Sequence, residues 1–415
     1  MAMKQLLIGN NSRTIRSNNL QAILLALLHH KHISRIRLAE LTSLSTTTIT
    51  NLITELLKQG IVAEEGTNAI KQRSGAGRPR MSLRLVPESR YAIGVHIGVG
   101  SVKVAVTDLR ANILTSLSLS HPLDRSAVDV LAEIAQLVQQ AITQLNIDTQ
   151  NIIGVGVGAS GLVNPDTGVN LIAPNLGWRD VAIKHVLSEH LTLPICVDNN
   201  VRAMALGESL FGSVPDVRLL AFVYVRIGVG AGFVIDGQLY RGSGAGAGEI
   251  GHTTMMPDNG ERCHCGNTGC LETLISEPAI MKLAHVLAKQ DEHGLLANHF
   301  RQVERPTIEQ VFAAARDGDV PTQNMLAERA RYMGVALSNL INILNPELIV
   351  FGGIFSQGYN LLLPTVEATI RQRTFADLGQ RVKFQPTHHK KNSGMVGSAA
   401  LALTTFFYQS AINLT

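Results

Sequence analysis

Two neighbouring segments of this 415-residue chain give the most specific clue to its fold: Gly248-Glu249-Ile250-Gly251-His252 and Cys263-His264-Cys265-Gly266-Asn267-Thr268-Gly269-Cys270-Leu271-Glu272. Three of the four cysteines lie in the second segment. Together with one histidine they form a Cys₃His set, which is a donor combination of closed tetrahedral zinc sites. The sequence therefore predicts a structural Zn²⁺ whose ligands are His252, Cys263, Cys265 and Cys270.

Two carboxylates, Glu249 and Glu272, flank these ligands. A metal that fixes this loop would also fix two acceptors able to bind vicinal hydroxyl groups, so we expect a polyol site beside the metal. The alternative is a plain structural zinc knuckle with incidental acids.

Bulk composition limits the class of protein. The chain is 45% hydrophobic and 16% charged, as in soluble globular proteins, and is long enough for two or three domains. Cys196 lies alone in the apolar run Leu193–Val197, where we expect a buried free thiol. This cysteine usage does not indicate a disulfide framework and favours a reducing cytoplasm. The run Ile23–Leu28 is too short to span a bilayer, so we expect no membrane insertion.

Charge is divided unevenly along the chain. Residues 1–90 hold thirteen Lys and Arg against five Asp and Glu, whereas the remainder holds twenty-three against twenty-seven. A basic head on a mildly acidic body predicts a polyanionic partner for the head alone.

The segment 17–60 has the pattern of three helices. Ser17-Asn18-Asn19 is expected to cap the first helix and Ser34 the second. The third is expected from about Thr46 to Gln59, with apolar residues at i, i+3, i+4 and i+7, and Gly60 ends it.

Polar side chains gather at the start of this third helix, where a recognition helix presents side chains to base edges in the major groove. Threonine is a poor helix former, so a threonine-rich first turn needs a compensating reason. The alternative is a three-helix module that binds protein. The expected DNA contacts are Thr46, Thr47, Thr48, Thr50 and Asn51.

Two short strands, Ile61–Glu64 and Met81–Leu85, are expected to follow as a wing. The basic, glycine-containing segment Lys71–Arg80 lies between them. We expect Arg78 and Arg80 to enter a narrow minor groove. The alternative is a flexible basic linker that contacts nothing.

From Tyr91 onwards, apolar strands alternate with helical segments, which predicts an α/β protein with two comparable lobes and a cleft between them. The expected domains are a winged helix-turn-helix with its linker in 1–85, a first lobe in 86–200 with 390–415, and a second lobe with the zinc loop in 201–389. The expected elements are strands Tyr91–Val95, Val102–Val106, Ile113–Leu119, Ile152–Val157 and Leu219–Val225, and a helix Ala127–Leu145.

Four glycine-rich segments are expected as turns where a ligand could approach the backbone. Each alone is a weak signal, but together they match the phosphate and adenosine loops of an actin-like nucleotide fold. They are Gly98–Gly100, Gly154–Gly158, Gly228–Gly232 and Gly352–Gly353.

On these motifs the chain resembles the ROK family (repressors, open reading frames, kinases), over about residues 15–405. It resembles in particular the winged-helix repressor branch, which includes the xylose and N-acetylglucosamine repressors and Mlc. The segment Glu249–Glu272 is the most specific part of the resemblance, and Gly75–Pro79 matches the repressor linker. The resemblance implies the zinc ligands given above and a sugar site in the cleft. The implied sugar contacts are Gly161, Asn175, Asn199, Asn200, Glu249, His252 and Glu272.

The chain departs from the family's kinases at three places. Asn200 stands where the kinases carry an aspartate general base, and an amide cannot accept the hydroxyl proton. His96 replaces the aspartate of the first phosphate loop, and Arg226 replaces a glycine of the second. Phosphoryl transfer depends on positioning and charge stabilisation, so we expect no kinase activity and no ATP.

The expected function is therefore a sugar-responsive transcriptional regulator, foremost a repressor, that binds operator DNA as a homodimer or homotetramer and a monosaccharide or related sugar as effector. One alternative is an ATP-dependent sugar kinase with a fused DNA-binding head. Another is a constitutive DNA-binding protein with a vestigial sugar site.

Overall fold

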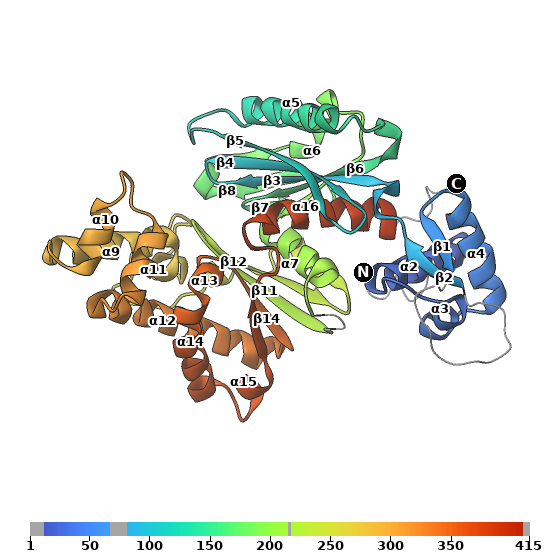
Figure 1. The fold of residues 1–415 in the computed structure, drawn as a ribbon. Helices are drawn as coiled ribbons and strands as arrows, with labels where there is room; N and C mark the ends of the chain where they lie inside the picture. Colours follow the sequence, from blue (N-terminus) through green and yellow to red (C-terminus); the bar gives the residue numbers. More distant parts are fainter. Residues whose placement is uncertain (1–11, 67–80, 215–216, 410–415) are drawn as a thin grey trace.

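A small helical head joins a two-lobed α/β body in the computed structural model (Figure 1). The structure describes residues 12–66, 81–214 and 217–409. Among these residues, none of the helices combines the length and apolar character needed to cross a membrane. Both the winged-helix head and the α/β body that the sequence predicts are present.

The head consists of three helices and a two-stranded antiparallel wing: α2 (Ser12–His29), α3 (Arg35–Thr42), α4 (Thr46–Lys58), β1 (Val62–Gly66) and β2 (Met81–Leu85). Ser34 caps α3 as predicted. The predicted cap at Ser17 is wrong, because α2 begins one and a half turns earlier and Ser17 lies buried inside it. Arg78 and Arg80, the predicted minor-groove side chains, lie outside the described residues.

The first lobe is built on a mixed five-stranded sheet of order β10-β6-β3-β4-β5. Helices α5 (Ala127–Leu145) and α6 (Ile183–His190) pack together on the outer side of the lobe (Figure 1). A small three-stranded sheet of β7 (Leu162–Asn164), β8 (Val169–Ala173) and β9 (Trp178–Val181) lies beside it. The main strands are β3 (Tyr91–Gly98), β4 (Ser101–Asp108), β5 (Ile113–Ser120), β6 (Ile152–Ala159) and β10 (Ile195–Asn199).

The second lobe has its own five-stranded sheet, of order β13-β12-β11-β14-β15. Its strands are β11 (Leu219–Val225), β12 (Val229–Ile235), β13 (Gln238–Tyr240), β14 (Leu348–Gly353) and β15 (Lys383–Pro386). Apolar side chains of this sheet share a core with the lobe's helices. These are α8 (Glu272–Ile275), α9 (Glu277–Gln290), α10 (Leu295–Arg301), α11 (Ile308–Arg316), α12 (Val320–Leu344), α13 (Ile354–Gln357), α14 (Tyr359–Arg373) and α15 (Leu378–Arg381).

Two helices, α7 (Asn200–Phe211) and α16 (Ser393–Leu403), pack against each other between the two sheets (Figure 1). All eleven residues of α16 are buried. Glycines of β6 allow α16 to pack closely against the first-lobe sheet, because a Cβ at Gly156 would lie 1.9 Å from the carbonyl oxygen of Ser398. The prediction of a turn at Gly154–Gly158 is therefore wrong, since these glycines lie within β6 and allow α16 to approach the sheet.

Candidate functional site

Four side chains meet in the loop before α8. The donor atoms of His252, Cys263, Cys265 and Cys270 all lie within 4.8 Å of one another. The Sγ atoms of Cys265 and Cys270 are 3.7 Å apart, and Cys263 Sγ is 3.7 Å from His252 Nδ1. A tetrahedral ion with Zn–S bonds of about 2.3 Å requires S···S separations of about 3.8 Å. This donor set therefore fits a tetrahedral metal ion.

Backbone hydrogen bonds shape the loop around this donor set. The amide of Gly266 donates to the carbonyl of Cys263, and the amide of Cys263 donates to Asn267. Gly266 has φ +99°, a conformation that favours glycine. A Cβ at Gly269 would lie 1.8 Å from the carbonyl oxygen of Met256, so a larger residue there would push the knuckle open.

The loop forms part of the wall of a cleft of about 810 Å³ between the lobes. A cavity of this size is within the range of small-molecule sites. Every residue that the sequence predicts as a sugar contact lines it: Gly161, Asn175, Asn199, Asn200, Glu249, His252 and Glu272.

The two lobes touch directly at this site. His264, between two of the cysteines, places its Nδ1 3.1 Å from Oδ1 of Asn175 in the first lobe. The carboxylate of Glu272 accepts from the amide of Val229 at 2.9 Å, beside the turn at Gly228. Sequence reasoning missed His264. Its position between two metal ligands is the signal that could have found it, because the metal loop fixes where its ring lies.

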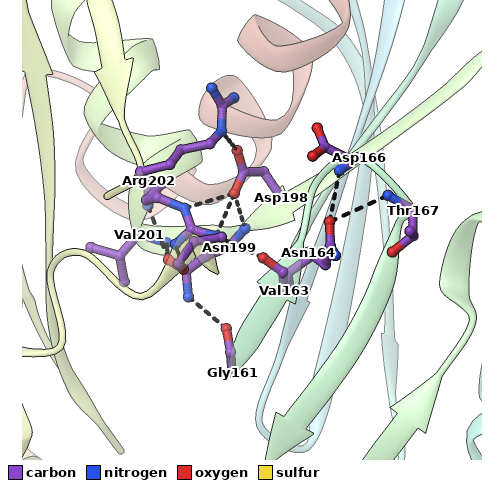
Figure 2. Close-up of polar contacts among 11 residues, drawn as sticks. Gly161, Val163, Asn164, Asp166, Thr167, Asp198, Asn199, Val201 and Arg202 are labelled. Carbon is purple, nitrogen blue, oxygen red and sulfur yellow. Dashed lines mark hydrogen bonds and ion pairs between the residues drawn. The ribbon is translucent and has the colours of Figure 1, made fainter. Parts of the chain in front are cut away.

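Asn199 has a structural task that the sequence did not predict. Its Oδ1 accepts from the amides of Val201 and Arg202 and caps α7, while its Nδ2 donates to the carbonyl of Gly161 at 2.9 Å (Figure 2). With both ends of the amide engaged, Asn199 fixes the edge of the cleft by positioning Gly161. Asn200, the next residue, is the first residue of α7 and lines the cleft as well.

A buried ion pair stands behind this edge. The guanidinium of Arg202 lies 2.7 Å from the carboxylate of Asp198, and both side chains are at most 2% exposed (Figure 2). Arg202 also donates to carbonyls on both sides of the cleft, at Val163 and Ala245. Arg241 binds the second oxygen of Asp198 at 2.8 Å. The network therefore links the two lobes at the start of α7.

Asn200, His96 and Arg226, the three residues at which the sequence predicts a departure from the kinase pattern, all line the cleft. Burial, with added repulsion from Lys103 and Arg226, lowers the pKa of His96 to about 4, so its imidazole is neutral near pH 7. Arg226 is half exposed and lies 3.6 Å from a carboxylate oxygen of Glu277.

The first two turns of α4 carry the predicted DNA contacts. Thr46, Thr47, Thr50 and Asn51 are exposed, whereas Thr48 is half-buried. The amide and hydroxyl of Thr48 both bond to Ser45, the N-cap. Threonine is a poor helix former, and its contacts with the N-cap explain why Thr48 is accommodated at the start of α4.

Cys196, the fourth cysteine, is a free thiol on β10. It is partly exposed rather than buried as predicted, and its Sγ lies 3.8 Å from the carbonyl of Val155. It is far along the chain from the metal loop and takes no part in the donor set.

Comparison with known proteins agrees with this architecture. The family model described as ROK family matches residues 92–405, so the chain belongs to the ROK family. The chain is also similar to the xylose repressor of Caldicellulosiruptor bescii, with 30% identity over 397 residues, 96% of this chain and 98% of the repressor. That similarity extends over the head.

Two solved structures are informative. A ROK family transcriptional regulator, a homolog of the Escherichia coli MLC protein, superposes with a TM-score of 0.81 at 28% identity, covering 96% of this chain and 98% of that one. A ROK family glucokinase from Streptomyces griseus, in complex with glucose and AMPPNP, has a TM-score of 0.68 at 27% identity. It covers 76% of this chain and 99% of its own, so its length corresponds to the body without the head.

Proposed function

We propose that this protein is a sugar-responsive transcriptional regulator, foremost a repressor, whose head binds operator DNA and whose cleft binds a monosaccharide or related sugar. The observation that carries the proposal is the position of α16. Its first residues, Ser393, Gly394 and Met395, line the cleft. Its last residue, Leu403, shares an apolar core with the head.

A helix that lines the cleft at one end and shares a core with the head at the other gives sugar binding a direct path to the head. Such a switch needs two states of the protein that differ in sugar affinity. Closure of the lobes around a sugar would shift α7 and α16, which lie between the sheets, and so reposition the head on its DNA. The named relative and the regulator structure support this function because both extend over head and body.

The head is proposed to read DNA through Thr46, Thr47, Thr48, Thr50 and Asn51, with Arg78 and Arg80 in the minor groove. A homodimer or homotetramer would match a palindromic operator with half-sites about one or two turns apart. Analytical ultracentrifugation of the free and DNA-bound protein tests this assembly. A monomer on a single half-site would contradict it.

The metal is proposed to be a structural Zn²⁺. Its ligands would hold the loop that carries His264 and places Glu249 and Glu272 on the cleft wall. The exposed carboxylate of Glu249 can accept hydrogen bonds from sugar hydroxyls. A sugar hydroxyl that is buried without a partner would cost binding free energy.

The alternative is a sugar kinase with a fused DNA-binding head. The similarity of the body to the glucokinase structure is the observation that favours this alternative. Asn200, His96 and Arg226 argue against it. An ATP-coupled phosphorylation assay separates the two functions, because sustained turnover that Asn200→Ala abolishes would contradict a pure regulator. A constitutive DNA-binding protein is disfavoured because the polar side chains of the cleft converge on one cavity.

The central test is a thermal-shift screen against common mono- and disaccharides, followed by binding to operator DNA selected from a random pool. We expect one sugar class to raise the melting temperature and to change DNA affinity. Asn175→Ala should lose both effects, while Asn298→Ala, an exposed amide on α10, should retain them. If no sugar changes either property, the sensing function is refuted.

A further inference from the structure

The segment 241–248 crosses from the second lobe to the first directly before Glu249, one of the proposed sugar contacts. This segment, here called the strap, follows β13 of the second lobe. Its short helical turn, Ser243–Ala245, contacts β7 of the first lobe. The amide of Ala247 donates to the carbonyl of Arg241 at 3.2 Å, so the two ends of the strap lie close together. The path of the strap therefore decides where Glu249 enters the cleft.

One buried carboxylate holds the strap at two places. Asp198, near the end of β10, accepts a hydrogen bond from Arg202 at 2.7 Å and another from Arg241 at 2.8 Å. Arg241 is itself the first residue of the strap. Arg202 also donates to the carbonyl of Ala245, in the middle of the strap. Asp198 therefore holds the strap directly through one arginine and indirectly through the other.

The carboxylate of Asp198 also fixes the opposite wall of the cleft. It accepts from the amide of Asn199 at 2.7 Å, and Asn199 in turn holds the carbonyl of Gly161 (Figure 2). A further nitrogen of Arg202 donates to the carbonyl of Val163 at 3.0 Å. One guanidinium therefore bridges a carbonyl of the first lobe and a carbonyl of the strap. Because its donors form a rigid planar fork, it sets the distance between the two carbonyls.

The backbone of the strap is constrained at the point where Arg202 binds it. Ala245 has φ +59°, a left-handed conformation that residues with a Cβ rarely adopt. Such a conformation persists only where the surrounding contacts enforce it. The end of the strap is fixed as well, because the carbonyl of Gly248 accepts from the amide of Ala231 on β12 at 2.7 Å. Glu249 therefore follows a segment whose shape is set by the contacts that hold it.

We propose that Asp198, Arg202 and Arg241 are positioning residues that set the width of the sugar site, and thereby the size of the sugar that the regulator accepts. The inference rests on the proposed function, because it concerns the same sugar site. The three side chains lie behind the residues that line the cleft, so they act through Gly161 on one wall and Glu249 on the other. Walls that are held at a fixed distance discriminate sugars by the substituents that fit between them.

The first test uses Arg202→Lys, which keeps a positive charge beside Asp198 but offers a single nitrogen in place of the fork. Calorimetry on the full-length parent protein and on the variant gives the dissociation constants of xylose, glucose, N-acetylglucosamine and maltose. The variant should shift the ratio of affinities by about tenfold in favour of the larger sugars, because the two walls are no longer held at one distance.

Arg241→Gln is the second variant, and it decides the matter if Arg202→Lys does not fold. Arg241 is 39% exposed, so its replacement threatens folding less than that of a buried arginine. It should shift the same ratio in the same direction by a smaller factor. Hydrogen exchange measured by mass spectrometry should be faster for the amides of 242–248. Arg218→Gln, whose exposed pair with Asp236 lies in the same lobe, is the matched control and should change neither property.

A common factor for all sugars that bind, or unchanged affinities, would overturn the inference, because the network would then only stabilise the fold. Unchanged exchange of the strap amides in Arg241→Gln would overturn it too, since the pair with Asp198 would not hold the strap. In both cases the proposed function stands, because the parent protein still binds a sugar. If no sugar of the panel binds the parent protein or changes its DNA affinity, the proposed function is refuted and the inference falls with it.

Discussion

At the scale of single residues, Arg202 is a charged side chain that is almost completely buried. It neutralises Asp198 in a setting where both side chains are nearly inaccessible. Arg202→Met would leave that carboxylate with Arg241 alone, which is 39% exposed. We expect a loss of about 3 kcal/mol in the free energy of unfolding, because a buried carboxylate that loses its buried partner is strongly destabilised.

Urea denaturation followed by circular dichroism measures this loss. Arg218→Met is the matched control, since its pair with Asp236 is 80% and 63% exposed and should contribute about 0–1 kcal/mol. Equal effects of the two substitutions would show that the buried network does not stabilise the folded protein.

His96 gives the molecule a defined acid sensitivity. Its folded pKa of about 4 lies below the usual value of 6.5. Between these two values the unfolded chain binds a proton that the folded protein does not, so stability falls as the pH drops from about 6.5 to about 4. His96→Gln should reduce the dependence of the unfolding midpoint on pH within this window, while His389, whose pKa burial also lowers to about 4, should keep part of it. His185→Gln, an exposed histidine, should leave the profile unchanged.

At the scale of structural elements, the packing of α16 depends on small residues in β6. Gly156→Ala would place a methyl group 1.9 Å from a backbone carbonyl oxygen of α16. Overpacking of this kind costs about 1–3 kcal/mol, so the melting temperature should fall by several degrees. Gly246→Ala is the control, because its φ is −101° and no heavy atom lies within 4 Å of the added Cβ. A similar melting temperature for both variants would contradict this account of the interface.

The metal loop is the second element whose integrity can be tested directly. Cys265→Ser should lose the metal, measured by plasma mass spectrometry, because a hydroxyl replaces a thiolate ligand. The sugar response should be lost with it, since the loop would no longer position His264 and Glu272. Cys196→Ala should retain both. A sugar response in metal-free Cys265→Ser would show that the two properties are uncoupled.

At the scale of the whole molecule, the head is joined to the body by a shared apolar core and by a few specific hydrogen bonds. Arg110 donates to the carbonyls of Leu28 and Leu27 at the end of α2, at 2.9 and 3.2 Å. The Tyr408 hydroxyl, just beyond α16, donates to Leu109 at 2.7 Å. These bonds join the head, the first-lobe sheet and the helix that lines the cleft.

Arg110→Ala should therefore reduce the coupling between sugar binding in the cleft and DNA binding by the head. It should reduce this coupling more than it reduces the affinity of either site for its own ligand. We expect the change in DNA affinity caused by sugar to shrink by about 1–2 kcal/mol, the value of charge-assisted hydrogen bonds. Arg371→Ala, in an exposed pair on α14, is the control. An undiminished sugar effect in Arg110→Ala would exclude this contact from the signalling path.

Local patterns were sufficient for several parts of this structure. Ala127–Leu145 forms the predicted helix because its apolar period and its Ser126 cap agree. The cysteine spacing identified a donor set that does converge. In contrast, Ser17 failed as a predicted cap, since nothing local distinguishes a cap from a buried serine inside a longer helix.

The sequence by itself determined the class of the protein: a basic winged-helix head, an α/β body and a Cys₃His loop beside two carboxylates. Only the tertiary structure decided that the glycines of β6 serve helix packing, that Asn199 is engaged in holding the cleft edge, and that His264 reaches Asn175. It also placed Lys103, Arg226 and Lys391 along one cleft. The reason is physical: periodicity and caps act over a few residues, whereas these contacts join segments that only the packing of the two lobes brings together.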